Sequence, residues 1–299
     1  MLLLSLVGEQ PIPNLLVARS LCPQSILWVC SQRTQSIAER LSPLLPPTSQ
    51  PLPPLVMPPY DVEEARKALG TSLQTYTGEE DEFVLNLTGG TKPMTWAALS
   101  VAAERSLPFV YLQTEGEHTV LYRYRTQSER FVLEDRRRVG ALIDIHDYLQ
   151  AHGLAEWHVK GGPRDPFEEL IEPVLREVCD EVLANLDFNV FEADFVIRCG
   201  NKVGVVECKR GTWRDRNERR AGMDQLVIAS EEKYLGTYTA RFLFTDRPLS
   251  ENHAQLARAR NIVQLLLFSA ARSRFTALSQ GDKNEIHSVI RKTLGSRER

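Results

Sequence analysis

The stretch Ala193–Gly211, with the sequence ADFVIRCGNKVGVVECKRG, decides how the second half of this chain is interpreted. Two apolar runs flank Gly200-Asn201, which is typical of a two-residue turn, so the stretch predicts an antiparallel β-hairpin. With that turn, Asp194 lies opposite Glu207, with Cβ atoms about 5 Å apart. Lys209 follows two residues later on the same face of its strand. The hairpin therefore predicts that two carboxylates and one ammonium group converge on a small patch.

These residue types fit metal-dependent chemistry on phosphate esters. Neighbouring carboxylates repel each other unless a cation lies between them, and a few oxygen ligands suit Mg²⁺ or Mn²⁺. Such a metal activates water and polarises a phosphoryl oxygen, while Lys209 can orient the water or neutralise charge on the phosphate. The alternative is a surface hairpin with a cross-strand charge pair. It explains less well why Glu207 and Lys209 end an apolar strand, where ionised groups need a compensating partner.

The same stretch resembles the PD-(D/E)xK nuclease superfamily, with Ala193 at the position of the proline in the family motif. The resemblance implies that Asp194, Glu207 and Lys209 are catalytic. It also implies a metal held by Asp194, Glu207 and the carbonyl of Cys208.

The family further places an acidic residue on the helix before the hairpin and often a glutamine on the helix after it. Glu168 and Gln225 are the matching residues in this sequence. Asp165 and Glu168 also have the spacing of a capping box, in which Glu168 would accept a hydrogen bond from the N-cap amide. Both interpretations of Glu168 remain open.

Basic residues follow the hairpin directly. Residues 209–220 carry four more basic than acidic side chains. A run of charge is usually a solvated helix face. Beside a metal site, such a run could instead hold a polynucleotide backbone and stack a base, as in proteins that bind single strands. We therefore expect nucleic-acid contacts from Arg210, Trp213, Arg214 and Arg216.

Length and composition predict two globular domains. The chain has 299 residues, of which 42% are hydrophobic and 25% charged, as is usual for globular proteins. A formal net charge of −3 argues against a chain that is basic throughout. A polar, arginine-rich stretch over Glu129–Arg138 suggests the boundary. We expect a first domain over 1–138, a linker helix over 139–160 and a second domain over 161–299.

The cysteines and the N-terminus indicate a cytoplasmic protein. The five cysteines form no CxxC pair and no cluster with zinc-finger spacing, which fits a reducing compartment. The apolar segment Met1–Gly8 lacks a basic flank and is too short to span a bilayer. We expect neither a signal peptide nor a membrane contact.

The first half predicts an open parallel α/β sheet. Apolar runs typical of buried strands lie at Leu2–Val7, Ser25–Cys30, Phe83–Leu87 and Phe109–Gln113. Helical stretches between these strands are expected at Asn14–Leu21, Thr34–Leu45, Asp61–Leu73 and Thr95–Arg105. The proline-rich stretch Pro43–Pro59 is expected to be a stiff excursion within the same domain, because the α/β pattern continues on both sides of it.

The second half predicts a further α/β core around the hairpin. Asp165-Pro166 predicts a helix start, and the helix is expected to run toward Asn185 with a kink or break at Pro173. After the hairpin, we expect elements at Arg219–Leu235 (helix), Ala240–Thr245 (strand), Glu251–Arg260 (helix) and Ile262–Phe268 (apolar segment).

Two segments of the first half follow predicted strands, namely VGEQPIPN at residues 7–14 and NLTGGTKPM at residues 86–94. Ligands of open α/β sheets bind at the carboxyl ends of strands, and a helix N-terminus favours an anion. Glycines there allow backbone amides to approach a ligand closely. The TGGTK sequence lacks the full Walker A spacing, and a helix cap with a tight turn is the simpler alternative.

These two segments resemble the CARF domain of CRISPR-associated ancillary proteins, a Rossmann-like dimer that binds cyclic oligoadenylates. The resemblance implies an N-terminal Rossmann-like CARF domain followed by a C-terminal PD-(D/E)xK restriction-endonuclease-like domain. It also implies a homodimer with a ligand pocket across its two-fold axis. By the matching loops, the ligand-binding residues are Gly8, Glu9, Gln10, Asn14, Ser31, Thr34, Thr88, Gly89, Gly90, Thr91, Lys92 and Met94.

Together, the motifs resemble the cyclic-oligoadenylate-activated nucleases of type III CRISPR antiviral defence. The expected function is Mg²⁺- or Mn²⁺-dependent cleavage of single-stranded RNA or DNA after an activator binds. Nicking of duplex DNA is a possible extension of this activity. Cyclic tetra-adenylate is the favoured activator. One alternative is a ligand-responsive nucleic-acid-binding regulator with a degenerate nuclease fold. Another is a restriction or repair endonuclease whose first half recognises DNA.

Overall fold

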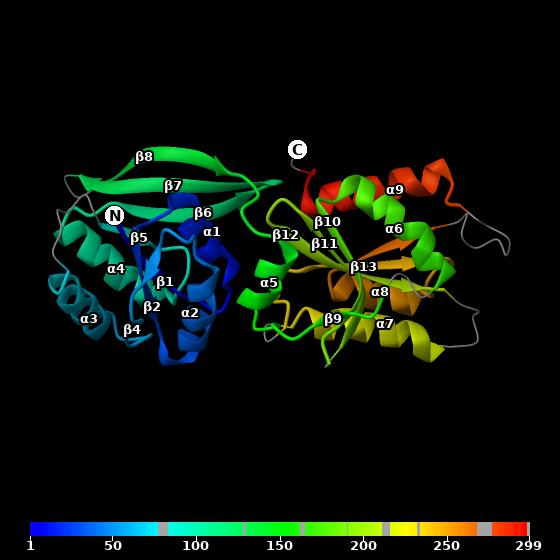
Figure 1. Cartoon of the computed structure of the whole chain (residues 1–299), viewed down its shortest axis with the longest axis horizontal. Coiled ribbons are helices and arrows are strands. Elements are labelled where there is room, and N and C mark those ends of the chain that lie inside the picture. The colour runs from blue at the N-terminus through cyan, green and yellow to red at the C-terminus, as the bar shows by residue number, and fades with distance from the viewer. Residues whose placement is uncertain are drawn as a thin grey trace. The chain divides into compact units, whose positions relative to one another are not determined.

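The computed structural model describes residues 1–76, 83–127, 130–161, 165–189, 191–210, 216–231, 234–267 and 277–297, without the side chains of residues 216–222. The chain divides into two compact units. The first contains Met1–Leu142 and Ala151–Gly153, and the second contains Ile143–Gln150 and Leu154–Arg299. Each unit has its own sheet (Figure 1). Residues 139–160, expected to form a linker, are divided between the units.

The first unit is built on a sheet with the strand order β3-β2-β1-β5-β6-β7-β8, in which β4 also pairs with β2. Its strands are β1 (Leu2–Leu6), β2 (Ser25–Cys30), β3 (Gln50–Pro51), β4 (Leu55–Val56), β5 (Phe83–Asn86), β6 (Phe109–Glu115), β7 (His118–Gln127) and β8 (Arg130–Val139). Its helices are α1 (Ile12–Leu21), α2 (Gln35–Leu41), α3 (Val62–Gln74) and α4 (Lys92–Glu104). Strands β2, β1, β5 and β6 are parallel, as predicted. Helices α3 and α4 pack on one face of the sheet, and α1 and α2 lie on the other (Figure 1).

The proline-rich stretch belongs to the first unit, as predicted. Its residues form β3 and β4, which both pair with β2 in parallel. The stretch therefore completes one side of the sheet and is not a connection between domains.

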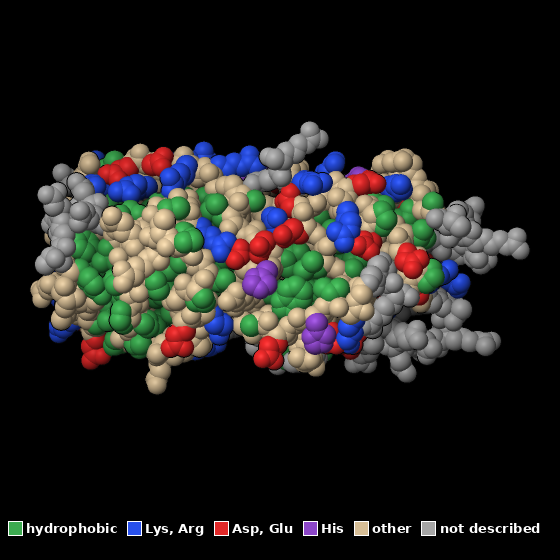
Figure 2. All heavy atoms as spheres, viewed as in Figure 1, with side chains coloured by type: hydrophobic (Ala, Val, Ile, Leu, Met, Phe, Trp, Pro, Cys, Tyr) green, Lys and Arg blue, Asp and Glu red, His purple; other side chains and the backbone are tan. Residues whose placement is uncertain are grey.

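Two antiparallel strands extend the sheet on its other side, where the sequence suggested a domain boundary. β7 pairs antiparallel with β6 and with β8, and β8 contains most of the arginine-rich stretch. The stretch is the edge strand β8, whose side chains are exposed except for Val139, and the first unit continues to Leu142 just beyond it. Such a strand shows no apolar alternation. Lys and Arg side chains line this edge in Figure 2.

The second unit has a sheet with the order β14-β13-β12-β11-β10-β9. Its strands are β9 (His158–Val159), β10 (Glu181–Asp187), β11 (Glu192–Cys199), β12 (Lys202–Lys209), β13 (Ala240–Thr245) and β14 (Ile262–Leu266). Its helices are α6 (Pro166–Val178), α7 (Arg216–Ala229), α8 (Glu251–Ala259) and α9 (Gln280–Leu294), and most of α5 (Ile145–Ala151) also belongs to it. The strands β9 to β12 are antiparallel, whereas β12, β13 and β14 are parallel.

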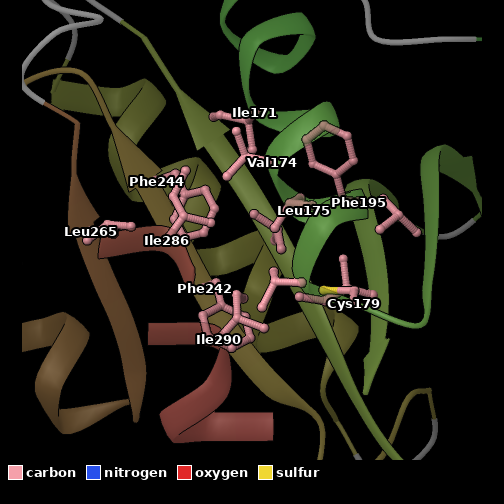
Figure 3. Packing of buried hydrophobic residues seen from close by; sticks show 14 of the residues in the cluster. Ile171, Val174, Leu175, Cys179, Phe195, Phe242, Phe244, Leu265, Ile286 and Ile290 are labelled. Carbon is pink, nitrogen blue, oxygen red and sulfur yellow. The ribbon is translucent and has the colours of Figure 1, made fainter. Parts of the chain in front are cut away.

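Buried apolar side chains hold α6 and α9 on one face of the second sheet. Figure 3 shows Leu175 of α6 and Ile290 of α9 around Phe242 and Phe244 of β13. Helices α7 and α8 lie on the opposite face (Figure 1). Val206 and Cys208 point into the α6/α9 core, so the alternation of side chains along β12 places Glu207 and Lys209 on the α7 side.

The helix predicted from Asp165-Pro166 begins there but does not reach Asn185. Helix α6 continues past Pro173 without a break but ends at Val178, and Cys179 is extended. The Asp180 amide then bonds the Arg198 carbonyl at 2.8 Å, and the chain continues as β10. Val182, Ala184 and Leu186 are buried two residues apart, which is a strand period that the sequence interpretation merged with the helix period.

Two other helices differ from expectation. The linker helix predicted over 139–160 is confined to α5, and α9 was not predicted at all. α9 begins at the Ser279 N-cap and buries Ile286, Ile290 and Leu294, which are four residues apart along one face. In the part of the chain that the structure describes, no helix is both long and apolar enough to cross a bilayer.

Candidate functional site

The β11–β12 hairpin brings Asp194, Glu207 and Lys209 together as predicted. Its ladder includes Cys199 with Lys202 and Phe195 with Val206. One step beyond the last pair, Oδ2 of Asp194 accepts a hydrogen bond of 2.7 Å from the Cys208 amide. The Asp194 carboxylate is therefore fixed against β12, beside Glu207.

The surroundings of Glu207 disfavour the ionised form of its carboxyl group. Its side chain is almost entirely buried, with 1% of the residue exposed. Burial, and then the negative charge of Asp194, raises the pKa of Glu207 from 4.5 to about 8, although Lys209 acts in the opposite direction. A buried carboxylate beside a second carboxylate has a net need for positive charge, which is the electrostatic condition for binding a cation.

Lys209 supplies part of that positive charge. Its ammonium group forms an ion pair with the Glu207 carboxylate. Burial alone lowers the pKa of Lys209, but the Glu207 carboxylate outweighs it and holds the pKa above its ordinary value. Lys209 therefore stays protonated at neutral pH.

Glu168 lies in the first turn of α6 and is buried. Its charge contributes to the raised pKa values of Glu207 and Cys208, which places its carboxylate near the hairpin residues. The N-cap Asp165 accepts from the Phe167 amide at 2.7 Å, one position short of the bond that a capping box requires. Glu168 therefore lies near the acidic cluster from the first turn of α6.

The donor set fits a hard divalent cation. Among the described residues, no three His, Cys, Asp or Glu side chains form a ready-made metal cage. Mg²⁺ does not need such a cage, because it binds through one or two carboxylates and completes its shell with water and phosphate oxygens. Asp194 and Glu207 provide two adjacent carboxylates, and the Cys208 carbonyl is the expected third oxygen. The Cys208 thiol itself lies in the apolar core on the other face of the sheet.

The remaining predicted residues of the second unit have different outcomes. Gln225 is half-buried on α7, which packs against β12. Arg210 is partly exposed, with its Nε 4.0 Å from Oδ2 of Asp246. Trp213 and Arg214 lie outside the described residues, as does the side chain of Arg216, the first residue of α7.

The sheet also brings residues to this site that the sequence interpretation did not select. Asn185 of β10 is buried with a positive φ of 52° and lies across from Asp194, between the pairs Ala184–Phe195 and Leu186–Ala193. Thr245 ends β13 and is the register partner of Lys209. The order of the parallel strands could have identified Thr245, because the carboxyl ends of neighbouring parallel strands meet.

The two predicted loops of the first unit also meet. β1 lies between β2 and β5, so the loops that follow these strands share one edge of the sheet. A Cβ atom on Gly8 would lie 3.0 Å from the Gly90 amide nitrogen, and one on Gly89 would lie 2.3 Å from the Leu6 carbonyl oxygen. Gly90 has a φ of 79°. The glycines are required because the two backbones touch.

A buried polar network lies beneath these glycines. Asn14 Oδ1 accepts from Ser5 Oγ at 2.7 Å and from Asn86 Nδ2 at 3.3 Å, and all three residues have no exposed surface. These bonds orient Asn14 so that its Nδ2 faces Gly89. Among the described residues, Nδ2 has no hydrogen-bond partner. A buried donor without a partner at the end of a sheet is expected where a ligand or an ordered water binds.

Several predicted ligand residues also have structural roles in the first unit. Thr88 Oγ1 donates to Asn86 Oδ1 at 2.6 Å. Thr91 caps α4 and donates to the Pro59 carbonyl. Ser31 and Thr34 form a capping box, and the Thr34 hydroxyl also donates to the Val7 carbonyl at 3.1 Å.

Other predicted ligand residues differ in exposure. Lys92, at the start of α4, is exposed, whereas the Met94 side chain is packed in the apolar core. Glu9 forms an ion pair of 2.7 Å with Arg33, and Gln10 is half-exposed. The loops therefore present backbone amides and the Lys92 ammonium.

The chain is similar to known proteins in sequence over its first half and in fold over its whole length. Residues 2–148 match the family model described as the Card1 CARF domain. No curated protein matches the chain. The structure of Can2 from Sulfobacillus thermosulfidooxidans in complex with cyclic tetra-adenylate aligns with a TM-score of 0.72 at 13% identity, covering 98% of this chain and 99% of Can2.

Two further solved structures align with the chain. Protein VC1899 from Vibrio cholerae aligns with a TM-score of 0.71 at 12% identity, and the alignment covers 98% of this chain and 99% of VC1899. A type III CRISPR defence DNA nuclease activated by cyclic oligoadenylate has a TM-score of 0.54 at 15% identity, over 97% of this chain and 51% of that nuclease.

These matches confirm the predicted class, in which a Rossmann-like CARF domain is followed by a second α/β domain with the Can2 fold. Within this class, residues 2–148 of the chain match the Card1 CARF family model. The resemblance to the CARF-domain CRISPR ancillary nucleases, inferred from VGEQPIPN, NLTGGTKPM and the hairpin, is thereby confirmed.

Proposed function

We propose that this protein is a cytoplasmic, homodimeric nuclease of type III CRISPR antiviral defence that is activated by a cyclic oligoadenylate. Its substrate is single-stranded RNA or DNA, with nicking of duplex DNA as a further activity. Residues 1–138 bind the activator, cyclic tetra-adenylate being the first one to test, and residues 161–299 carry the nuclease site. The CARF family match and the alignment with cyclic tetra-adenylate-bound Can2 support this proposal.

The observation that carries the nuclease assignment is the buried Glu207 next to the half-buried Asp194, with Lys209 beside them. A surface hairpin would leave these groups in water, where each carboxylate keeps its ordinary pKa. Here the pKa of Glu207 is raised to about 8 by burial and by Asp194. Ionisable groups held in this way are typical of active sites.

Each side chain of this site has its own role in the proposed phosphodiester hydrolysis. Asp194 and Glu207, together with the Cys208 carbonyl, would hold Mg²⁺ or Mn²⁺, and Glu168 adds negative charge near them. The bound metal supplies an activated water and neutralises charge on the phosphate. The Cys208 amide keeps the Asp194 carboxylate in place. Lys209, protonated at neutral pH, donates to the phosphate oxygen on which negative charge increases.

The first unit needs little charge to bind a cyclic nucleotide. Backbone amides around Gly8 and Gly89, the N-terminus of α4 and the Lys92 ammonium can each face a phosphate. For binding to activate the nuclease, the activator must bind the active arrangement of the protein more tightly than the inactive one.

The decisive experiment incubates the full chain with Mn²⁺, labelled single-stranded RNA or DNA, and one cyclic adenylate of each ring size in turn. We expect cleavage with one activator, none without it, and none for Glu207→Gln. Cleavage by Glu207→Gln at the wild-type rate would contradict the site assignment. Electrophoretic binding of nucleic acid without cleavage, dependent on the activator, would favour a regulator instead.

A further inference from the structure

The hydroxyl group of Thr245 is buried and has no hydrogen-bond partner among the described residues. Thr245 is 3% exposed. The backbone carbonyl of the same residue is used, since it accepts from the Leu267 amide at 2.8 Å. Burying a hydroxyl without a partner is costly, and valine has the same shape without that cost. Such a group in a folded protein requires an explanation.

The sheet places this hydroxyl beside Lys209. Strands β12 and β13 are parallel, with Glu207 paired to Leu243 and Lys209 paired to Thr245. Register partners on neighbouring strands lie about 4.8 Å apart and project on the same face. Thr245 is therefore the side-chain neighbour of Lys209 on the face that carries Glu207. Leu243, the partner of Glu207 itself, offers no polar group.

We propose that Thr245 is a positioning residue for Lys209, an inference that rests on the proposed nuclease function. In the observed structure the ammonium of Lys209 is engaged by the Glu207 carboxylate. When a divalent cation takes that carboxylate, the ammonium loses this partner while remaining half-buried on the same face. Thr245 Oγ1 then accepts a hydrogen bond from Lys209 Nζ and holds the ammonium toward the substrate phosphate. The Thr245 hydroxyl therefore has no partner in the metal-free protein and bonds Lys209 in the metal-bound protein.

The test compares Thr245→Val, which keeps the shape and removes the hydroxyl, with Thr245→Ser, which keeps the hydroxyl. For Thr245→Val we expect about a 10- to 100-fold lower kcat with little change in KM, as for a misplaced catalytic group. We also expect about fivefold weaker Mn²⁺ binding, followed by the thermal shift that Mn²⁺ causes without nucleic acid, since one hydrogen bond is lost. Thr245→Ser should restore both quantities toward wild type.

Thr239→Val is the matched control. Thr239 is also buried, but its hydroxyl donates to the Leu235 carbonyl at 2.6 Å and contacts the Tyr148 hydroxyl at 2.9 Å. Thr239→Val should lower the melting temperature and leave Mn²⁺ binding unchanged, whereas Thr245→Val should keep or raise the melting temperature of the metal-free protein.

Three results would overturn the proposal. The first is wild-type kcat and Mn²⁺ binding in Thr245→Val. The second is a fall in its melting temperature as large as that of Thr239→Val, which would give the hydroxyl a purely structural role. The third is a wild-type protein that neither cleaves nor is stabilised by Mn²⁺, which would refute the proposed function and this inference with it. Loss of cleavage in Glu207→Gln alone, with Thr245→Val active, would refute only the inference.

Discussion

The candidate sites of the two units are built by opposite means. In the first unit, glycines bring two loops into contact, and an oriented, neutral network of Ser5, Asn14 and Asn86 supports them. In the second unit, charged side chains crowd one end of a hairpin, and the burial of Glu207 beside Asp194 is only partly compensated by Lys209.

The difference concerns what each site loses when its ligand is absent. The loops of the first unit are held by backbone contacts and hydrogen bonds that need no ligand, so their stability depends on shape. The acidic cluster of the second unit contains unbalanced negative charge, so its stability depends on pH and on cations. Substitutions should therefore act through sterics in one unit and through electrostatics in the other.

The largest effect is expected from Glu207→Gln. Loss of one carboxylate from the pair should lower activator-dependent cleavage by at least about 10³-fold, because water activation and charge stabilisation fail together. The measurement is the single-turnover rate on a labelled oligonucleotide. Binding of cyclic tetra-adenylate to the same variant, measured by calorimetry, should remain at the wild-type level. A loss of activator binding would mean that the fold, and not the site, was damaged.

The pH dependence of stability tests the same cluster without substrate. Because the pKa of Glu207 is raised to about 8, the folded state binds this proton more tightly than the unfolded state, whose carboxyl has a pKa near 4.5. Metal-free wild-type protein should therefore lose free energy of unfolding, relative to Glu207→Gln, as pH rises from about 4.5 to 8. The difference is on the order of a few kcal/mol. Denaturant titrations at several pH values measure it.

Mn²⁺ provides the control for this pH effect. A bound cation should remove most of the difference at pH 8, because it replaces the missing positive charge. If the two proteins changed stability in parallel across this pH range, Glu207 would not be the strained carboxylate of this site.

Gly89→Ala tests the steric character of the first unit. The added Cβ would lie 2.3 Å from the Leu6 carbonyl oxygen and 2.9 Å from the Gly8 amide nitrogen. We expect a loss of about 1–3 kcal/mol in the free energy of unfolding, together with loss of activator binding. Gly70→Ala is the control, because nothing lies within 4 Å of its Cβ position in α3. That change should stabilise the protein by about 0.5–1 kcal/mol. Equal effects of the two substitutions would refute the close approach of the loops.

The smallest effect is expected from Lys92→Ala. Lys92 is exposed at the start of α4, so its charge should contribute about 1 kcal/mol or less to binding an anionic activator. That corresponds to about fivefold weaker binding, and the loss should shrink at high salt. Lys67→Ala, which removes an exposed lysine of α3, should leave activator affinity unchanged. A loss of 100-fold or more for Lys92→Ala would show that charge, and not the backbone, dominates this site.

The sequence predicted the elements whose residues are buried in a simple pattern. The runs at Ser25–Cys30 and Ala240–Thr245 are strands with those same bounds, and the turn at Gly200-Asn201 set the register that unites Asp194 with Glu207. A short turn fixes register locally, so this part of the site could be derived without knowledge of the rest of the fold.

The features that were missed depend on neighbours distant in sequence. Among the described strands β8 has one neighbour, β7, and its side chains are exposed except for Val139, so its sequence carries no strand pattern. Thr245 becomes a candidate site residue because it lies next to Lys209. That neighbourhood can be predicted only when the order of the parallel strands is known. Asn14 was predicted as a ligand residue, but the network that orients its amide joins three separate elements.

The edge position of β8 has a consequence for the motions of the first unit. An edge strand is bonded on one side only, so the outward amides of Arg130–Val139 have no strand to protect them from exchange with solvent. The amides of β1, bonded on both sides at the centre of the sheet, should exchange only when the whole unit opens. Amide exchange rates should therefore differ along this one sheet, from exchange within seconds at β8 to exchange that requires global unfolding at β1. A ligand that slows exchange could then be located by the strands whose amides it protects.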